Sequence, residues 1–256
     1  MLVLRSGYDK KSLVLLGIVV AIGAASGVVW REYLSLTWVD FDPLLVACWV
    51  LMVALAGWRF SLKRDLPLAA VAFIGGAMIE TWGTRSGLWT YFTNEKPPLF
   101  ILPAWPLAAL ATERIMRAFD YVLERVKLGH GALRAVHGTV FLAFCMLLWT
   151  WTARGRAHPT TMLAYACVAI TCFNGRTPRA DLLRFGAGSL LGWLLEYWGT
   201  TRHCWTYWDG GTPPFPAVLS HGFATVAFAR GVGILQTLIE SRGRGAQLER
   251  RLRSDS

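Results

Sequence analysis

Two glutamates, Glu80 and Glu196, lie 116 residues apart in matching surroundings within apolar stretches of the chain. The segment that starts at Glu80, ETWGTRSGLWTYFTNEKPP, aligns without a gap with the segment that starts at Glu196, EYWGTTRHCWTYWDGGTPP. Chance is a poor explanation for matched Trp, Gly, Thr, Tyr and Pro residues in one register, so we interpret the segments as an internal repeat. Three further pairs match at the same offset: Asp65 with Asp181, Gly76 with Gly192, and Arg114 with Arg230.

A carboxyl group among apolar and aromatic side chains is suited to acid–base chemistry. Burial favours its neutral form, so it can stay protonated near neutral pH and act as a general acid. The faces of Trp and Tyr rings can stabilise a cation. This combination suits protonation of an alkene, followed by hydration, isomerisation or cyclisation of an isoprenoid. It suits equally a site that binds a cationic headgroup or passes a proton.

We predict that Glu196 and Glu80 act as acid and base, with the second segment as the working site because it holds more polar side chains. The predicted catalytic residues are Glu196, Glu80, His221 and Asp209. The predicted substrate-binding residues are Trp82, Thr84, Arg85, Trp89, Tyr91, Trp105, Trp198, Thr200, His203, Trp205 and Tyr207. A structural interpretation stands beside each: an aromatic belt at the membrane surface, a hydrogen-bonded structural acid assisted by Thr84 or Thr200, and a polar contact for His221.

The elements that position these residues are predicted to be membrane-spanning helices. Of 256 residues, 54% are hydrophobic and only 16% are charged, and about 20 apolar residues cross a bilayer. The fold class is therefore all-α, a polytopic membrane helical bundle of about eight transmembrane helices in two parallel four-helix repeats. We expect a first repeat over 1–127, a second over 128–242 and a basic cytoplasmic tail over 243–256. The predicted spans are 13–30, 43–60, 66–83, 98–113, 132–152, 159–174, 182–199 and 216–239.

Each glutamate is predicted near the outer end of a span and pointing into the bundle. Small residues precede it at four-residue intervals, which is typical of a helix face that another helix approaches closely. These residues are Ala72 and Gly76 before Glu80, and Gly188 and Gly192 before Glu196. After each glutamate we expect the chain to leave the helix at Gly-Thr, fold Trp-Thr-Tyr over the carboxyl and begin the next helix after Pro-Pro. Trp105 and His221 then face the site from that next helix.

The basic residues predict an orientation with both termini in the cytoplasm, because Lys and Arg are retained on that side. The net charge of +10 is spread over the termini and alternate loops, which excludes nucleic acid as the expected partner. We expect a multi-pass protein of the cell membrane, namely a bacterial inner membrane. The basic positions on the cytoplasmic side include Arg5, Lys10, Lys11, Arg59, Lys63, Arg64, Arg114, Arg117, Arg125, Lys127, Arg176, Arg179, Arg242, Arg244, Arg250, Arg251 and Arg253, whereas Glu32, Asp40 and Asp42 lie outside and only Arg154 and Arg156 are misplaced.

The first repeat resembles the integral-membrane carotenoid hydratases of carotenoid biosynthesis over about 30 residues. The residues that carry the resemblance are Glu80, Gly83, Arg85, Gly87, Trp89, Tyr91, the following prolines and Trp105. The second repeat departs from this pattern, with His203 in place of the second glycine. The site is also similar in kind to sterol isomerases of the emopamil-binding type. Both resemblances imply acid–base chemistry on an apolar polyene or terpenoid.

Three functions remain open from the sequence. One is an enzyme, possibly a lyase or isomerase, acting on a membrane lipid or isoprenoid. The second is a transporter or flippase of an amphiphile. The third is a non-catalytic subunit or assembly factor that docks a membrane-protein partner, or a second copy of itself, through the outer aromatic loops. No motif indicates a metal or another cofactor, and the five cysteines show no zinc or redox spacing.

Overall fold

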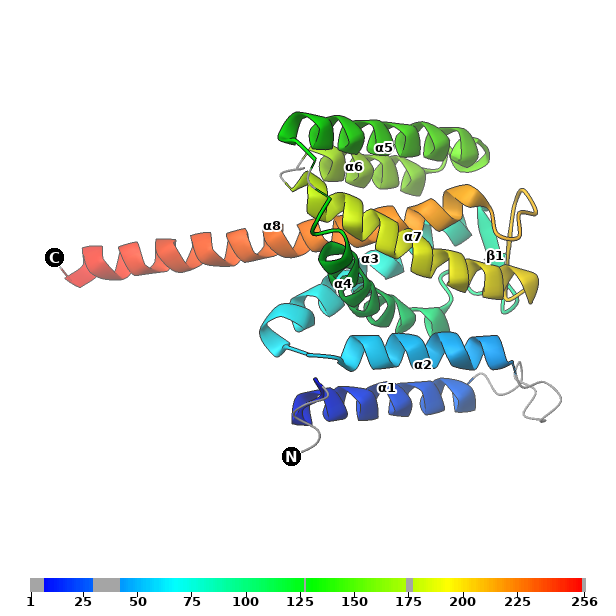
Figure 1. Ribbon diagram of the computed structural model, residues 1–256, viewed down its shortest axis with the longest axis horizontal. Coiled ribbons are helices and arrows are strands. Elements are labelled where there is room, and N and C mark those ends of the chain that lie inside the picture. The colour runs from blue at the N-terminus through cyan, green and yellow to red at the C-terminus, as the bar shows by residue number, and fades with distance from the viewer. Residues whose placement is uncertain (1–6, 30–41, 127, 174–176, 255–256) are drawn as a thin grey trace.

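The computed structural model describes residues 7–29, 42–126, 128–173 and 177–254, with backbone only over 242–254. Arg5, Glu32, Asp40, Lys127 and Arg176, and the side chains of the predicted tail, lie outside the described residues. The described chain is helical, with one short two-stranded sheet (Figure 1). Its elements are α1 (Lys10–Val29), α2 (Pro43–Gly57), α3 (Leu62–Arg85), β1 (Trp89–Tyr91), η3 (Leu99–Ile101), α4 (Ala104–Val122), α5 (His130–Trp151), η4 (Thr152–Gly155), α6 (Pro159–Phe173), α7 (Pro178–Thr201), β2 (Trp205–Tyr207) and α8 (Phe215–Ser254).

Five of the described helical stretches are long and apolar enough to cross a membrane, which indicates a membrane protein. They are Lys10–Val29, Leu62–Arg85, Leu99–Val122, His130–Gly155 and Phe215–Ser241. Helices α2 and α6 are apolar but have only 15 residues each, and α7 is long but less apolar. Many large apolar side chains, such as Leu13, Ile18 and Leu142, lie exposed on the outer surface. Lipid tails, unlike water, accommodate such a surface without cost.

Four helices, α3, α4, α7 and α8, form the centre of the bundle through mutual contacts. The α1–α2 pair covers one side and the α5–α6 pair the other, and the start of α1 and the end of α8 lie away from the sheet (Figure 1). Helix α8 continues without a break to Ser254 and projects beyond the bundle. The predicted close approach along the small-residue face is confirmed at Gly188, where an added Cβ would lie 2.9 Å from Gly222 Cα.

The two Trp-Thr-Tyr segments are strands β1 and β2, which pair with each other in an antiparallel register. Trp89 lies opposite Tyr207, and Tyr91 lies opposite Trp205. The sequence predicted that each segment folds over its own glutamate but not that the two segments hydrogen-bond together. This pairing joins the two outer loops, so the residues of both repeats meet at one end of the bundle.

The prediction that the chain leaves the helix at Gly-Thr is wrong. Helix α3 continues to Arg85 and α7 to Thr201, so both Gly-Thr pairs are helical. The threonine hydroxyls satisfy a helical carbonyl one turn back: Thr84 Oγ1 donates to the Glu80 carbonyl and Thr200 Oγ1 to the Glu196 carbonyl, each at 2.6 Å. Threonine in a helix commonly makes this bond. Helix α8 does begin directly after Pro214, as predicted, whereas η3 separates Pro98 from α4.

Candidate functional site

Glu80 is buried near the C-terminal end of α3, and its carboxylate accepts three hydrogen bonds. Trp89 Nε1 (3.1 Å) and Tyr91 OH (3.0 Å) donate to Oε2, and Trp105 Nε1 (3.1 Å) donates to Oε1. An indole nitrogen can only donate a hydrogen bond. Both oxygens of Glu80 are therefore held as acceptors by donors that do not titrate near neutral pH.

Glu196 occupies the matching place in α7, with one changed partner. Trp205 Nε1 donates to Oε2 at 2.8 Å, and Tyr207 OH donates to Oε1 at 2.8 Å. The third contact, at 2.9 Å to Oε1, is made by His221 Nε2 in place of an indole nitrogen. An imidazole nitrogen can donate or accept a proton. The second carboxyl thus has a partner with which it can exchange a proton.

The two tyrosines of the strands remain hydrogen-bond donors. Burial, followed by the negative charge of the nearby glutamates, raises the pKa of Tyr91 and of Tyr207 well above that of an ordinary phenol. Each hydroxyl therefore keeps its proton and directs it at the glutamate of its own segment. The tyrosines orient the carboxyls and do not act as bases.

Glycine is required beneath each tryptophan of the strands because the indole ring lies against the helix backbone. A Cβ added to Gly83 would lie 1.9 Å from the Trp89 ring, and one added to Gly199 would lie 2.0 Å from the Trp205 ring. Residues three apart share a helix face, so this contact brings each indole nitrogen to the glutamate one turn earlier. The matched glycines are thus part of the site and not turn residues.

A second pair of glycines admits the side chains from the next helix. A Cβ on Gly76 would lie 2.2 Å from Trp105, and one on Gly192 would lie 2.5 Å from His221 Cβ. The Trp105 and His221 rings stack on each other, with centroids 5.4 Å apart and planes at 12°. Because each ring also contacts its own glutamate, the stack links the two carboxyls into one site.

A cavity of about 950 Å³ reaches both glutamates. This volume lies within the range of small-molecule sites. Most of its walls are aliphatic or aromatic, from helices α2 to α8 and both strands. The lining side chains that can ionise or carry a charge are Cys48, Glu80, Tyr91, Cys167, Glu196, Tyr207, His221 and Arg230. The geometry is that of an apolar chamber with a few convergent polar groups.

Most predicted site residues meet at this chamber, and some lie elsewhere. Trp82, Trp89, Tyr91, Trp105, Trp198, Trp205, Tyr207 and His221 line the cavity with the two glutamates. Asp209 is not beside Glu196: it accepts a hydrogen bond from Trp151 Nε1 at 2.7 Å and one from the Gly211 amide. Arg85 and His203 are exposed at the helix ends, outside the cavity lining, and the hydroxyls of Thr84 and Thr200 are used by the backbone.

The tryptophans Trp82 and Trp198 each reach across to the other repeat. Trp82 Nε1 donates to Thr161 Oγ1 of α6 at 2.9 Å, whereas Trp198 Nε1 donates to Asp42 Oδ2, the N-cap of α2, at 2.8 Å. Arg202 forms an ion pair with the same aspartate. Despite an opposing effect of partial burial, these hydrogen bonds and that of the Leu45 amide lower the pKa of Asp42. Asp42 thus fastens α2 to the end of α7.

The sequence analysis did not identify Arg230 as part of the site. Arg230 lines the cavity and forms an ion pair with Asp181 at 2.6 Å. The matching pair in the first repeat, Arg114 with Asp65 at 2.7 Å, is almost wholly buried. The Asp and the Arg of each pair recur at the repeat offset, but the sequence alone does not show that the two residues form an ion pair.

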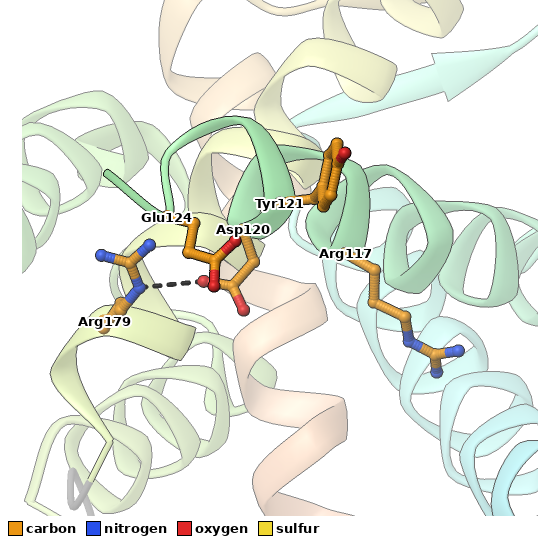
Figure 2. Close-up of a pocket in the computed structure, with 5 residues that line it drawn as sticks. All are labelled: Arg117, Asp120, Tyr121, Glu124 and Arg179. Carbon is orange, nitrogen blue, oxygen red and sulfur yellow. Dashed lines mark hydrogen bonds and ion pairs between the residues drawn. The ribbon is translucent and has the colours of Figure 1, made fainter. Parts of the chain in front are cut away.

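A smaller pocket of about 500 Å³ lies at the C-terminal end of α4 and has no predicted site residue. Figure 2 shows its lining side chains: Arg117, Asp120, Tyr121, Glu124 and Arg179. Arg179 Nε contacts Asp120 Oδ1 at 2.9 Å, and both side chains are about half exposed. Exposed pairs of this kind contribute little stability. Neither Glu80 nor Glu196 lines this smaller pocket.

Among the described residues, no group of three or more His, Cys, Asp or Glu side chains is placed to hold a metal ion. Comparison with protein-family models, curated sequences and solved structures finds no match to this chain.

Proposed function

We propose that this protein is an integral membrane enzyme that performs acid–base chemistry on an isoprenoid-type apolar lipid. The observation that carries the proposal is the Glu196–His221 pair, a proton-exchanging contact at 2.9 Å that faces an apolar cavity of about 950 Å³. Most of the described residues that line the cavity are aliphatic or aromatic, which suits an apolar substrate. An apolar substrate gains free energy from leaving water, and here it enters directly from the bilayer.

The pair supplies the two proton transfers that such a reaction needs. In the first, an acidic proton shared by Glu196 and His221 moves to one carbon of a substrate double bond, which leaves a carbocation on the other carbon. In the second, the now basic pair accepts a proton, either from a neighbouring carbon of the cation or from water that adds to it. The first outcome is isomerisation or cyclisation, and the second is hydration. Faces of the surrounding indole rings stabilise the cation.

Glu80 has a different role in this scheme. Its three partners are two indole N–H groups and one phenol, so it has no neighbour that readily exchanges a proton. We assign it to holding the two strands and Trp105 in place, and to adding negative charge beside a developing cation. Trp105 in turn positions the His221 ring by stacking.

Access to the cavity is from the side of the bundle. Several lining residues are also exposed on the outer surface, among them Ile74 of α3 and Leu163 of α6. We expect a molecule dissolved in the bilayer to enter the cavity between these two helices. The resemblance to carotenoid hydratases supports the same substrate class.

The proposal places eight spans in the membrane as two parallel four-helix repeats, with both termini in the cytoplasm. The charges of α7 are compatible with a span because they are paired inside the bundle: Asp181 with Arg230, and Arg184 with Glu113. Antiparallel pairing of β1 and β2, centred on Thr90 and Thr206, is the arrangement expected of two repeats related by a two-fold axis along the membrane normal.

Mass spectrometry of the organic extract from mildly solubilised, purified protein tests the proposal. We expect a bound polyene or terpenoid product with the wild type, and its unmodified precursor with Glu196→Gln. Glu80→Gln is the matched control and should retain conversion at a reduced level. Loss of a general acid or base typically costs 10²- to 10⁴-fold in rate, so the difference should be plain.

Bulk phospholipid alone in all three extracts would overturn the enzyme proposal. Proton-dependent flux of an unmodified lipid into liposomes would then favour a transporter. A co-purifying protein that is lost when Trp208 or Phe92 of the outer loops is changed would favour a docking subunit.

A further inference from the structure

The matched arginines Arg114 and Arg230 differ in how many of their nitrogens donate hydrogen bonds. In the first repeat, all three guanidinium nitrogens of Arg114 donate. Its Nε donates to the Trp58 carbonyl (3.1 Å), its Nη1 to Asp65 Oδ1 (3.0 Å), and its Nη2 to Asp65 Oδ2 (2.7 Å) and the Ala56 carbonyl (3.3 Å). This arginine is 1% exposed and does not line the cavity. It links α4 to the end of α2 and the start of α3.

In the second repeat, the guanidinium of Arg230 has a donor to spare. Its Nη2 donates to Asp181 Oδ2 at 2.6 Å, but its Nη1 is buried and has no hydrogen-bond partner among the residues that the structure describes. A buried N–H without an acceptor is costly, and more so on a charged group. Because Arg230 lines the cavity, an acceptor on a bound molecule can satisfy this donor.

Arg230 lies well away from the proposed proton-transfer pair. It follows His221 by nine residues on the same helix, which is about 13 Å along the axis at the rise of an α-helix. Between these two residues, the cavity is lined by Phe223, Ala224, Ala227 and Phe228 of α8. A single molecule can therefore contact Arg230 with one end and His221 with a part further along its apolar chain.

The surroundings of Arg230 favour an anionic acceptor. A guanidinium forms its strongest hydrogen bonds with oxyanions, above all phosphate and carboxylate. Asp181 also contacts His137 Nε2 at 3.2 Å, so Arg230 is not the only partner of this carboxylate. The pair in the first repeat has no such spare donor.

We propose that the cavity binds an amphiphile whose oxyanion headgroup, phosphate or carboxylate, pairs with Arg230, while its apolar chain runs toward His221. This inference deepens the proposed function and rests on it for the identity of the chain as an isoprenoid. The headgroup fixes the register of the chain, so that one particular double bond lies at the Glu196–His221 pair.

Binding of matched probes to the full-length protein in mild detergent tests the inference. The probes are farnesyl phosphate, farnesol and palmitate, measured by isothermal titration. With the wild type we expect farnesyl phosphate or palmitate to bind at least about tenfold more tightly than farnesol, as a charge-assisted hydrogen bond provides. The tighter of the two acids identifies the oxyanion. Equal affinity for acid and alcohol would overturn the inference without recourse to any variant.

Variants then locate the preference. Arg230→Gln should bind the acid and the alcohol equally, with the affinity for farnesol unchanged, whereas Arg230→Lys should keep part of the preference. An acid preference that survives Arg230→Gln, in protein that still binds farnesol, would place the anion elsewhere and contradict the assignment. If no isoprenoid is converted but the acid preference holds, the proposed function fails and the Arg230 site stands. If a neutral isoprenoid is converted and there is no acid preference, the Arg230 site fails and the proposed function stands.

Discussion

The two repeats hold the same carboxyl in the same way except at one position. Glu80 and Glu196 each lie in a helix three residues before a glycine. Each accepts hydrogen bonds from the Trp and the Tyr of the strand that follows. The third partner is Trp105 for one and His221 for the other. An indole fixes a carboxylate, whereas an imidazole exchanges a proton with it. In the proposed function, this single side chain is what turns a scaffold that holds a buried acid into an acid–base site.

The same contrast recurs at the opposite end of the bundle. All three guanidinium nitrogens of Arg114 donate within the first repeat, whereas Arg230, which lines the cavity, has a buried Nη1 without a partner among the described residues. Both differences place the less fully bonded or proton-exchanging side chain in the second repeat. Under the proposed function, the first repeat is the structural support and the second repeat faces the ligand.

Replacement of Arg114 should lower the free energy of unfolding much more than replacement of Arg230, and this is the largest difference that we expect between the repeats. Arg114→Gln leaves Asp65 buried with only the half-exposed Arg64 as an ionic partner, which should cost about 3–5 kcal/mol. Arg230→Gln should cost less, because His137 remains beside Asp181. Thermal unfolding in detergent, followed by tryptophan fluorescence, measures both. Equal losses would show that the two ion pairs are equivalent and would remove the contrast.

Alanine at the glycines beneath the strand tryptophans should have the next largest effect. Gly199→Ala places a methyl group 2.0 Å from the Trp205 ring, and we expect a loss of about 1–3 kcal/mol together with displacement of Trp205 from Glu196. Gly186→Ala on the same helix is the control, because nothing lies within 4 Å of its added Cβ. It should be neutral or slightly stabilising.

Gly83→Ala extends this test to the first repeat. We expect the same loss of stability as for Gly199→Ala, because its Cβ would lie 1.9 Å from Trp89. The comparison separates packing from chemistry: both variants should unfold at lower temperature, but only Gly199→Ala should lower conversion more than the loss of folded protein explains. Equal losses of conversion per folded molecule would contradict a division of roles.

The smallest expected effect concerns the clamp that Asp42 forms between α2 and α7. The hydrogen bonds and ion pair of Asp42 lower its pKa, so they stabilise the fold above the ordinary pKa of an aspartate and are lost as pH falls through the lower value in the folded protein. Asp42→Asn should therefore lower the melting temperature slightly at neutral pH and by less in strong acid. Thr161→Val, which removes the matched contact of Trp82, should show no such pH dependence.

Much of this architecture follows from sequence, because apolar length and small-residue spacing are local properties. Helices form at all eight predicted stretches, and Trp105 and His221 meet the glutamates as their shared offset indicated. The failures lie where repeats meet. An offset alignment shows which residues are equivalent, but not that β1 pairs with β2 or that Trp198 reaches Asp42 across the bundle.

Two errors have local physical causes. Gly-Thr resembles a helix end, yet Gly83 lies inside α3. Its lack of a side chain lets the Trp89 ring pack against the helix, and this contact depends on tertiary packing. Asp209 is a predicted catalytic residue only because it adds to the polar side chains of the second segment. Instead it accepts the indole N–H of Trp151, which is 58 residues away on α5.

Exchange of the two distinguishing side chains tests the central claim most directly. His221→Trp gives Glu196 the same kinds of donor as Glu80, at a position that packs against Gly192 as Trp105 packs against Gly76. Isoprenoid conversion, measured by mass spectrometry of the lipid extract per folded protein, should fall by about 10²-fold or more with folding retained. Trp105→His should lower it far less. Full conversion by His221→Trp, or an equal loss in both variants, would contradict the assignment of proton transfer to the Glu196–His221 pair.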